Sequence, residues 1–287
     1  IFAFESYKTY FMKNTNFSTD SIFLKIPTNA SKVQLLDTLS NYLLNMDTFE
    51  KAAIKKDYFL NIRAGRFKIN KDDSNNKIIN SLRSNNIPLK VTFNNIETLN
   101  NLAGVISKKI EADSASIVMA FKDKIFLNDL NLDEDSVFGL FIPNTYEFFW
   151  NTDAVGFRDR ILKEFDNFWN DNRIEKIKKI NLNPIEVMVL ASIVQKETPK
   201  VDERPTISGV YLNRLRKKMK LQADPTVVYS IKQKQGFDKV IRRVLYKDLR
   251  IKSKYNTYYY KGLPPGPIVT PDISSIESVI NLSLIHI

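Results

Sequence analysis

Cysteine is missing from this chain of 287 residues, and histidine occurs only once, as His286 beside the C-terminal residue. The lack of cysteine excludes disulfide bonds, thiolate zinc sites and cysteine nucleophiles. A single histidine at the end of the chain also argues against a Ser-His-Asp triad and against a metal site built from several histidines. Acid–base chemistry in this protein therefore falls to carboxylates, lysines or tyrosines.

The sequence also lacks an apolar run of the ~18 residues that a transmembrane helix needs. Its first residues, IFAFESYKTYF, have neither the charged start nor the cleavage site of a signal peptide. The chain begins with Ile1 rather than methionine, which indicates a piece of a longer protein. We therefore expect any membrane anchor to lie upstream of Ile1.

Positive charge is in excess, with 43 Lys and Arg residues against 32 Asp and Glu residues and a formal net charge of +11. Such an excess is typical of nucleic-acid-binding proteins, but no helix-turn-helix, zinc-finger or RNA-binding signature accompanies it. A nucleic-acid-binding function would therefore rest on charge alone.

Apolar spacing predicts an α+β (mixed α/β) fold, in which short strands and helices alternate through the first third of the chain. Ser31 is a candidate N-cap for the first of these helices. The alternation of apolar and polar residues at 88–93 predicts a half-buried strand. The other predicted elements are strands at 22–26 and 64–69, a short helix at 47–55, and a helix through Ile78, Ile79 and Leu82.

Helical spacing prevails from residue 95 to residue 135, and the aromatic-rich stretch 138–150 suits a buried strand or an ordered turn. Residues 155–180 alternate basic and acidic side chains over an apolar stripe, which predicts one long surface helix. Pro184 then starts a helix that is apolar on nearly all sides up to Val194. We expect this last helix to be central to the fold.

Glu197 stands where that apolar helix ends, in the sequence Gln195-Lys196-Glu197. A carboxylate that emerges from a buried helix is partly desolvated, and desolvation raises its pKa toward that of a general acid. The alternative is a surface glutamate paired with Lys196 or Lys200. Spacing alone favours the alternative.

Two proline-containing segments have the composition of sugar-binding loops. Residues 221–226, LQADPT, hold Gln, Asp and Thr around a proline, and residues 255–268 combine tyrosines with a proline-stiffened loop. Rigid polar groups and aromatic rings both suit sugar recognition. An Asp-Pro turn that caps the next helix, and a structural loop with aromatic packing, are the alternatives. The basic cluster at 214–220 is by itself a solvated helix face.

Taken in order, these segments resemble the endolytic murein transglycosylases of the MltG/YceG type. The resemblance extends upstream and covers nearly the whole chain with several specific motifs. The motifs are AGRFKI (64–69), PLKVTF (88–93), LFIPNTYEF (140–148), LASIVQKET (190–198), ERP (203–205), GVYLNRL (209–215), LQADPTVVY (221–229), YNTY (255–258) and GLPPGPI (262–268).

The resemblance implies a small LysM-like subdomain at 1–90 and a larger mixed α/β catalytic domain at 91–287. The family cleaves the β-1,4 bond between N-acetylmuramic acid and N-acetylglucosamine inside nascent glycan strands and leaves a 1,6-anhydro-muramyl end. Its catalytic glutamate corresponds to Glu197. Many relatives have Glu where this chain has Gln195, and a glutamine cannot act as the acid.

The resemblance further implies that a set of polar and aromatic residues lines the glycan groove, and that neither a metal nor a cofactor takes part. These candidate substrate-binding residues are Gln222, Asp224, Thr226, Tyr255, Asn256 and Thr257. The family is held in the cytoplasmic (inner) membrane by one N-terminal helix, with its catalytic domain facing the periplasm or cell wall. Peptidoglycan synthases and the elongation or division machinery are the expected protein partners.

The last residues, LSLIHI, depart from the family, so we expect a truncated or foreign C-terminus and no function for His286. Two other functions stay open. A muramidase-like hydrolase would use Asp224 or Asp202 as a second carboxylate. A non-catalytic glycan-binding or division-scaffold protein would use the LysM-like part. In each case the positive charge fits work beside an anionic membrane on a polymer that carries peptide carboxylates.

Overall fold

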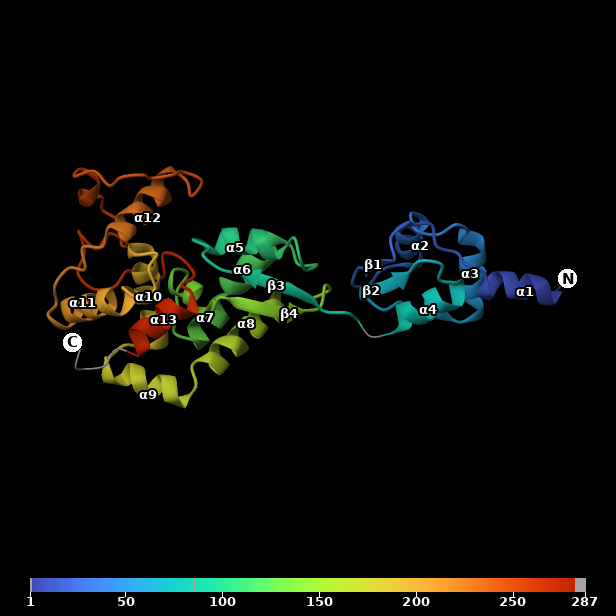
Figure 1. The fold of residues 1–287 in the computed structure, drawn as a ribbon, viewed down its shortest axis with the longest axis horizontal. Helices are drawn as coiled ribbons and strands as arrows, with labels where there is room; N and C mark the ends of the chain where they lie inside the picture. Colours follow the sequence, from blue (N-terminus) through green and yellow to red (C-terminus); the bar gives the residue numbers. More distant parts are fainter. Residues whose placement is uncertain (1, 85, 282–287) are drawn as a thin grey trace. The chain divides into compact units, whose positions relative to one another are not determined.

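The computed structural model describes residues 2–84 and 86–281, so the expectations for His286 and the last residues lie outside the described part (Figure 1). Helices and short strands are mixed along the chain, which confirms the predicted α+β class. The chain divides into two compact units. The first comprises the chain up to Val91 with Lys108–Ala112 and Tyr146–Asp153, and the second comprises the remainder. A LysM-like identity for residues 1–90 stays a prediction.

The first unit is built around one antiparallel strand pair. β1 (Ser21–Ile26) pairs with β2 (Gly65–Asn70), in a register that sets Leu24 opposite Phe67. Leu24 and Phe67 belong to a buried core that the neighbouring helices complete. The helical elements of this unit are α1 (Phe2–Phe11), α2 (Lys32–Ser40), α3 (Met46–Lys55), the 3₁₀ turn η1 (Tyr58–Leu60) and α4 (Asn75–Arg83).

Local capping sets the start of α2. The Ser31 side chain accepts a hydrogen bond from the Gln34 backbone N–H, and the Gln34 side chain accepts one from the Ser31 backbone N–H. This reciprocal arrangement satisfies two of the donors that a helix leaves free at its N-terminus. The predicted N-cap at Ser31 is confirmed.

In the second unit, helices outnumber strands among the described residues. β3 (Leu89–Phe93) pairs with β4 (Asn144–Phe148), and the division between the two units falls within these strands. Between them lie α5 (Leu99–Ile106), α6 (Ser114–Phe121), α7 (Lys124–Asp129) and the 3₁₀ turn η2 (Ser136–Leu140). After them come α8 (Ala154–Phe168), α9 (Asp171–Lys179), α10 (Pro184–Glu197), α11 (Arg204–Arg216), α12 (Asp224–Gln235), the 3₁₀ turn η3 (Asp248–Arg250) and α13 (Ile273–Ile280).

The prediction of one long helix over 155–180 is wrong. The chain forms two helices there, α8 and α9, because Asn170 starts a new one. The Asn170 side chain accepts a hydrogen bond of 3.1 Å from the Arg173 N–H, and the preceding Trp169 is buried. Charge alternation and the apolar stripe continue across the break, so periodicity alone does not reveal it.

Helix α10 is the centre of the second unit. All eight residues from Val187 to Val194 are buried, and α11, α12 and α13 pack against the helix. Asn183 and Glu186 form a capping box at its start, with Pro184 in the first turn. The expectation that this helix is central is confirmed. No helix in the described part of the chain has both the length and the apolar character to span a membrane.

Candidate functional site

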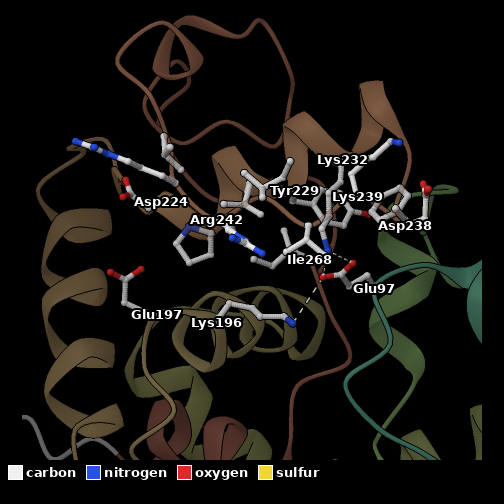
Figure 2. Close-up of a pocket in the computed structure, with 17 residues that line it drawn as sticks. Glu97, Lys196, Glu197, Asp224, Tyr229, Lys232, Asp238, Lys239, Arg242 and Ile268 are labelled. Carbon is white, nitrogen blue, oxygen red and sulfur yellow. Dashed lines mark hydrogen bonds and ion pairs between the residues drawn. The ribbon is translucent and has the colours of Figure 1, made fainter.

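A pocket of about 820 Å³ lies at the C-terminal end of α10. It is bounded by that helix, by α12 and by the segment 237–244 that follows α12. Figure 2 shows Lys196 and Glu197 on the α10 side, and Asp224 and Lys232 on the α12 side. Because apolar residues such as Val228 also line the pocket, its wall offers both charges and apolar surface, as sugar recognition requires.

The Glu197 carboxylate is held in this pocket by a buried helix and a tyrosine. The Tyr211 hydroxyl, on α11, donates a hydrogen bond of 3.0 Å to Oε2 of Glu197. The side chain stays accessible from the pocket, but the protein around it removes part of its water. This desolvation raises the pKa of Glu197, and the nearby charge of Asp224 raises it further. The hydrogen bond from Tyr211 and the charge of Arg214 oppose the rise without cancelling it.

A raised pKa keeps Glu197 protonated at a higher pH than an ordinary glutamate, which a general acid requires. Lys196 Nζ lies 3.7 Å from Oε1 of Glu97, and Lys200 Nζ lies 2.8 Å from Oε1 of Glu203. Within the described residues, no lysine or arginine forms an ion pair with Glu197. Glu197 is exposed, as the alternative expects, but its expected pairing with Lys196 or Lys200 is wrong.

Asp224 reaches the same pocket from the first turn of α12. Its Oδ1 accepts a hydrogen bond of 2.7 Å from the Tyr258 hydroxyl. Desolvation, together with this bond to Asp224, raises the pKa of Tyr258 to about 12, so the phenol remains a donor. Asp202 is exposed and does not line the pocket. Of the two residues considered as a second carboxylate, only Asp224 shares the pocket with Glu197.

Three of the predicted substrate-binding side chains are buried. Thr226 Oγ1 and Thr257 Oγ1 lie 2.9 Å apart, and Thr257 Oγ1 also accepts a 3.0 Å hydrogen bond from the Ala223 N–H. Asn256 donates to two main-chain carbonyls of the segment before it, at 3.1 and 2.8 Å. These bonds hold the segment 255–258 against the start of α12. Direct contact of these three side chains with substrate stays a prediction.

Tyr255 and Gln222 also lie outside the pocket lining. The Tyr255 ring is buried, and its centroid lies 4.6 Å from that of Tyr229, which does line the pocket. The Tyr255 hydroxyl donates a hydrogen bond of 3.1 Å to Oδ1 of Asp135. The side chain of Gln222 is exposed, and its backbone adopts the left-handed conformation with φ 55°. Its backbone N–H donates a hydrogen bond of 3.2 Å to the Thr257 carbonyl. Of the six predicted substrate-binding residues, the structure places Asp224 alone in the pocket with Glu197.

The side chain of Gln195 fixes the end of α10. Its Oε1 accepts a hydrogen bond from the Asp272 N–H, and its Nε2 donates to Oδ1 of Asn95 at 3.4 Å. Arg204, buried on α11, donates from Nη1 to both carboxylate oxygens of Asp272 at 2.8 and 2.9 Å. Through these contacts, the end of α10 is connected to α11 and to the start of α13 at Gln195, two residues before Glu197.

A comparison with protein families matches residues 24–284 to the YceG-like family. The chain belongs to the YceG-like family. This confirms the resemblance seen in the sequence motifs. The YceG-like protein is similar to the endolytic murein transglycosylase of Bacillus subtilis (strain 168), with 28% identity over 284 residues. That match covers 92% of this chain and 76% of the relative.

The chain is also similar to a second relative in sequence and to a solved structure in fold. An endolytic murein transglycosylase of Streptococcus pneumoniae serotype 2 is 34% identical over 143 residues, a match that covers 50% of this chain and 26% of that relative. A crystal structure of a yceG-like protein from Listeria monocytogenes has a TM-score of 0.60 at 24% sequence identity. The match covers 93% of this chain and 91% of that one, so the two share a fold over nearly their whole length.

Several pocket residues of this YceG-like protein were not predicted from its sequence. Glu97 accepts hydrogen bonds from Lys232 Nζ at 2.9 and 2.8 Å and lies near Lys196. Glu97 precedes Lys232 by 135 residues, so no local pattern joins them. Arg242 and Arg243 line the pocket from the segment after α12, and their only sequence signal is the adjacent pair of arginines.

Metal-ligating side chains do not gather in the part of the chain that the structure describes. No group of three or more His, Asp or Glu side chains there is arranged to hold a metal ion. The pocket carboxylates instead pair with cations or tyrosine hydroxyls, as Glu97 does with Lys232 and Asp224 does with Tyr258.

Proposed function

We propose that this chain is an endolytic murein transglycosylase with Glu197 as its single general acid and base. The observation that carries the proposal is the placement of Glu197. It ends a buried helix, opens onto a pocket, has a raised pKa and forms no ion pair among the described residues. Membership of the YceG-like family, and two relatives named endolytic murein transglycosylase, support the same activity.

The proposed substrate is the β-1,4 bond between N-acetylmuramic acid and N-acetylglucosamine in nascent glycan strands. Protonated Glu197 gives its proton to the glycosidic oxygen as the bond from that oxygen to the muramyl anomeric carbon breaks. The 6-hydroxyl of the same muramyl residue then attacks this carbon, and Glu197 takes up the hydroxyl proton. The new bond closes a 1,6-anhydro ring, so no water is consumed and Glu197 returns to its starting state.

One carboxylate suffices for this reaction because the nucleophile belongs to the substrate. Glycosidases that use water or an enzyme nucleophile need a second carboxylate. Here the 6-hydroxyl is already attached to the reacting ring, which replaces a bimolecular attack with an intramolecular one. Desolvation of Glu197 supports its first role, as an acid. The hydrogen bond from Tyr211, which favours the ionised form, supports its second role, as a base.

The test is product mass spectrometry on uncrosslinked glycan strands with wild type and Glu197→Gln. We expect anhydro-muramyl ends from wild type, and a rate at least about a hundredfold lower from the variant, since a general acid contributes that much. Glu175→Gln is the matched control, because Glu175 is an exposed residue of α9 outside the pocket. Full activity of Glu197→Gln would show that another group is the acid.

A muramidase is the second candidate, and the position of Asp224 favours it. Asp224 lines the pocket, and its charge acts on the pKa of Glu197. A carboxylate in this place could activate a water molecule for attack on the anomeric carbon. Products of hydrolysis carry one more water than anhydro products, so the same mass spectra separate the two reactions. Reducing ends that disappear in Asp224→Asn would establish the muramidase.

The cellular setting stays a proposal that rests on the family resemblance. It places the protein at the cytoplasmic membrane, with the catalytic domain on the side of the cell wall, as a partner of peptidoglycan synthases and of elongation or division proteins. The excess of positive charge is compatible with an anionic membrane surface. Crosslinking in cells that produce the full-length protein, followed by identification of the captured partners, would test this setting.

A further inference from the structure

The charges in the pocket do not balance. Its lining contains five cationic side chains, and it contains three carboxylates besides Glu197, so the sum is +2 while Glu197 holds its proton. Two of the cations, Lys196 and Lys232, share Glu97. These two lysines with Glu97 leave a charge of +1, and the other three cations, Lys239, Arg242 and Arg243, leave another +1 after Asp224 and Asp238 are counted.

These three cations come from one stretch of chain, the segment that follows α12. All three side chains are exposed, and within the described residues none of them forms an ion pair. Asp238 lies beside Lys239 in sequence and also lines the pocket, so it offsets at most one of the three charges. In Figure 2 the Arg242 side chain reaches into the pocket above Lys196, on the face opposite α10. Of the three cations, Arg242 thus lies across the pocket from the proposed acid.

We propose that Lys239, Arg242 and Arg243 form an anion subsite that binds the carboxylates of the peptide carried by the muramyl residue. This inference rests on the proposed function, because it places a muramyl residue in the pocket beside Glu197. Such a subsite makes strands with intact peptides the preferred substrate class, and strands stripped of their peptides poor ligands.

The chemistry of the three side chains supports a carboxylate ligand. A guanidinium group presents a planar fork of N–H donors that matches the two oxygens of a carboxylate or phosphate. In a murein strand the repeating anionic group is the peptide carboxylate, whereas a phosphate occurs only at the end that is linked to a lipid carrier. A site that cuts inside the strand therefore meets carboxylates at every muramyl residue.

Binding is measured first, because it does not depend on turnover. Both proteins in this comparison carry Glu197→Gln, which prevents cleavage. One of them also carries Arg242→Gln/Arg243→Gln, and the other keeps both arginines. The ligands are uncrosslinked strands with intact peptides, the same strands after removal of the peptides by an amidase, and peptide-bearing strands that keep the lipid pyrophosphate. Lys247→Gln is the matched control, since Lys247 is exposed in the same loop and does not line the pocket.

We expect the double substitution to weaken binding of peptide-bearing strands about tenfold, as the loss of charge-assisted hydrogen bonds at an accessible site predicts. Stripped strands should bind weakly and equally to both proteins, and Lys247→Gln should change nothing. Equal binding of intact and stripped strands by the protein with both arginines would overturn the proposal. A loss confined to strands with the pyrophosphate would also overturn it, in favour of a phosphate ligand.

Cleavage by the protein with Glu197 intact separates this inference from the proposed function. With both correct, Arg242→Gln/Arg243→Gln raises KM for peptide-bearing strands about tenfold and leaves kcat nearly unchanged. Peptide-dependent binding without any cleavage by wild type would refute the transglycosylase activity and support the anion subsite. Cleavage of intact and stripped strands with the same KM would support the transglycosylase activity and refute the anion subsite.

Discussion

The contact between Arg204 and Asp272 allows a quantitative test of how the end of α10 is held. Arg204 is only 5% exposed, and its Nη1 contacts both oxygens of Asp272. The variant Asp272→Asn keeps the size of the side chain and can still cap α13, since asparagine is a good N-cap. It removes the negative charge and leaves the charge of Arg204 buried without its partner.

Removing one partner of a buried ion pair costs about 3–5 kcal/mol of unfolding free energy. The side chain of Asp272 is 43% accessible, so water can take over part of the lost interaction. We therefore expect the lower end of that range, about 3 kcal/mol at pH 7. The cost has a defined pH dependence. Burial alone would raise the pKa of Asp272, but hydrogen bonds from Ser275, Ser274 and Arg204 outweigh it and hold the pKa below its usual range.

A carboxyl group with a lowered pKa in the folded state stabilises the protein above its unfolded pKa, and that contribution disappears as the pH falls through the folded value. The gap between wild type and Asp272→Asn should therefore be full at pH 7 and should shrink at pH values below about 4. Acidification removes the same charge from wild type that the substitution removes at every pH.

The assay is urea unfolding followed by tryptophan fluorescence. The chain has two tryptophans, Trp150 and Trp169, so a Trp150→Phe background leaves Trp169 to report the second unit alone. Lys200→Gln is the control, because Lys200 forms an exposed ion pair and should leave the midpoint in place. A gap below about 1 kcal/mol at pH 7, or a gap that is as large at pH 3 as at pH 7, would refute the reasoning.

Three further substitutions test other contacts. Tyr211→Phe removes a hydrogen bond that favours ionised Glu197, so its pKa should rise further and the alkaline limb of the pH profile of kcat/KM should move to higher pH; an unmoved limb would contradict this role. Gly266→Ala places a Cβ 2.1 Å from the backbone oxygen of Asp135, so we expect a loss of about 3 kcal/mol in urea unfolding, and an unchanged midpoint would count against it. Thr257→Val deprives a buried backbone N–H of its acceptor and should cost about 1–3 kcal/mol by the same measurement, whereas a neutral result would show that water replaces the hydroxyl.

Sequence reasoning succeeded where the deciding signal is local. The start of α10 follows from Asn183 and Pro184, and its central place follows from the apolar run to Val194. The place of Glu197 at the end of that run is also a local feature, whereas its catalytic role was implied by the family resemblance and stays a prediction. Each of these signals lies within a few residues of the feature that it determines.

Reasoning from sequence failed where a residue's environment comes from distant parts of the chain. The hydrogen-bonded contact between Thr226 and Thr257 joins residues 31 apart in the chain, so no local pattern reveals it. The same holds for Glu97, whose lysine partner on α12 follows it by 135 residues. The break at Asn170 was missed for another reason, since a cap can interrupt a helix without changing the apolar period.

The buried pair of Thr226 and Thr257 has a consequence for how this protein could diversify. The pair anchors the chain on both sides of the segment 237–254, so that segment begins and ends at fixed points. Doubling the length of a flexible loop between fixed ends costs only about 0.6 kcal/mol of closure entropy. Insertions and charge changes there can therefore accumulate with little effect on the position of Glu197. The proposed acid and the proposed anion subsite thus lie on different parts of the fold, and the two can evolve at different rates.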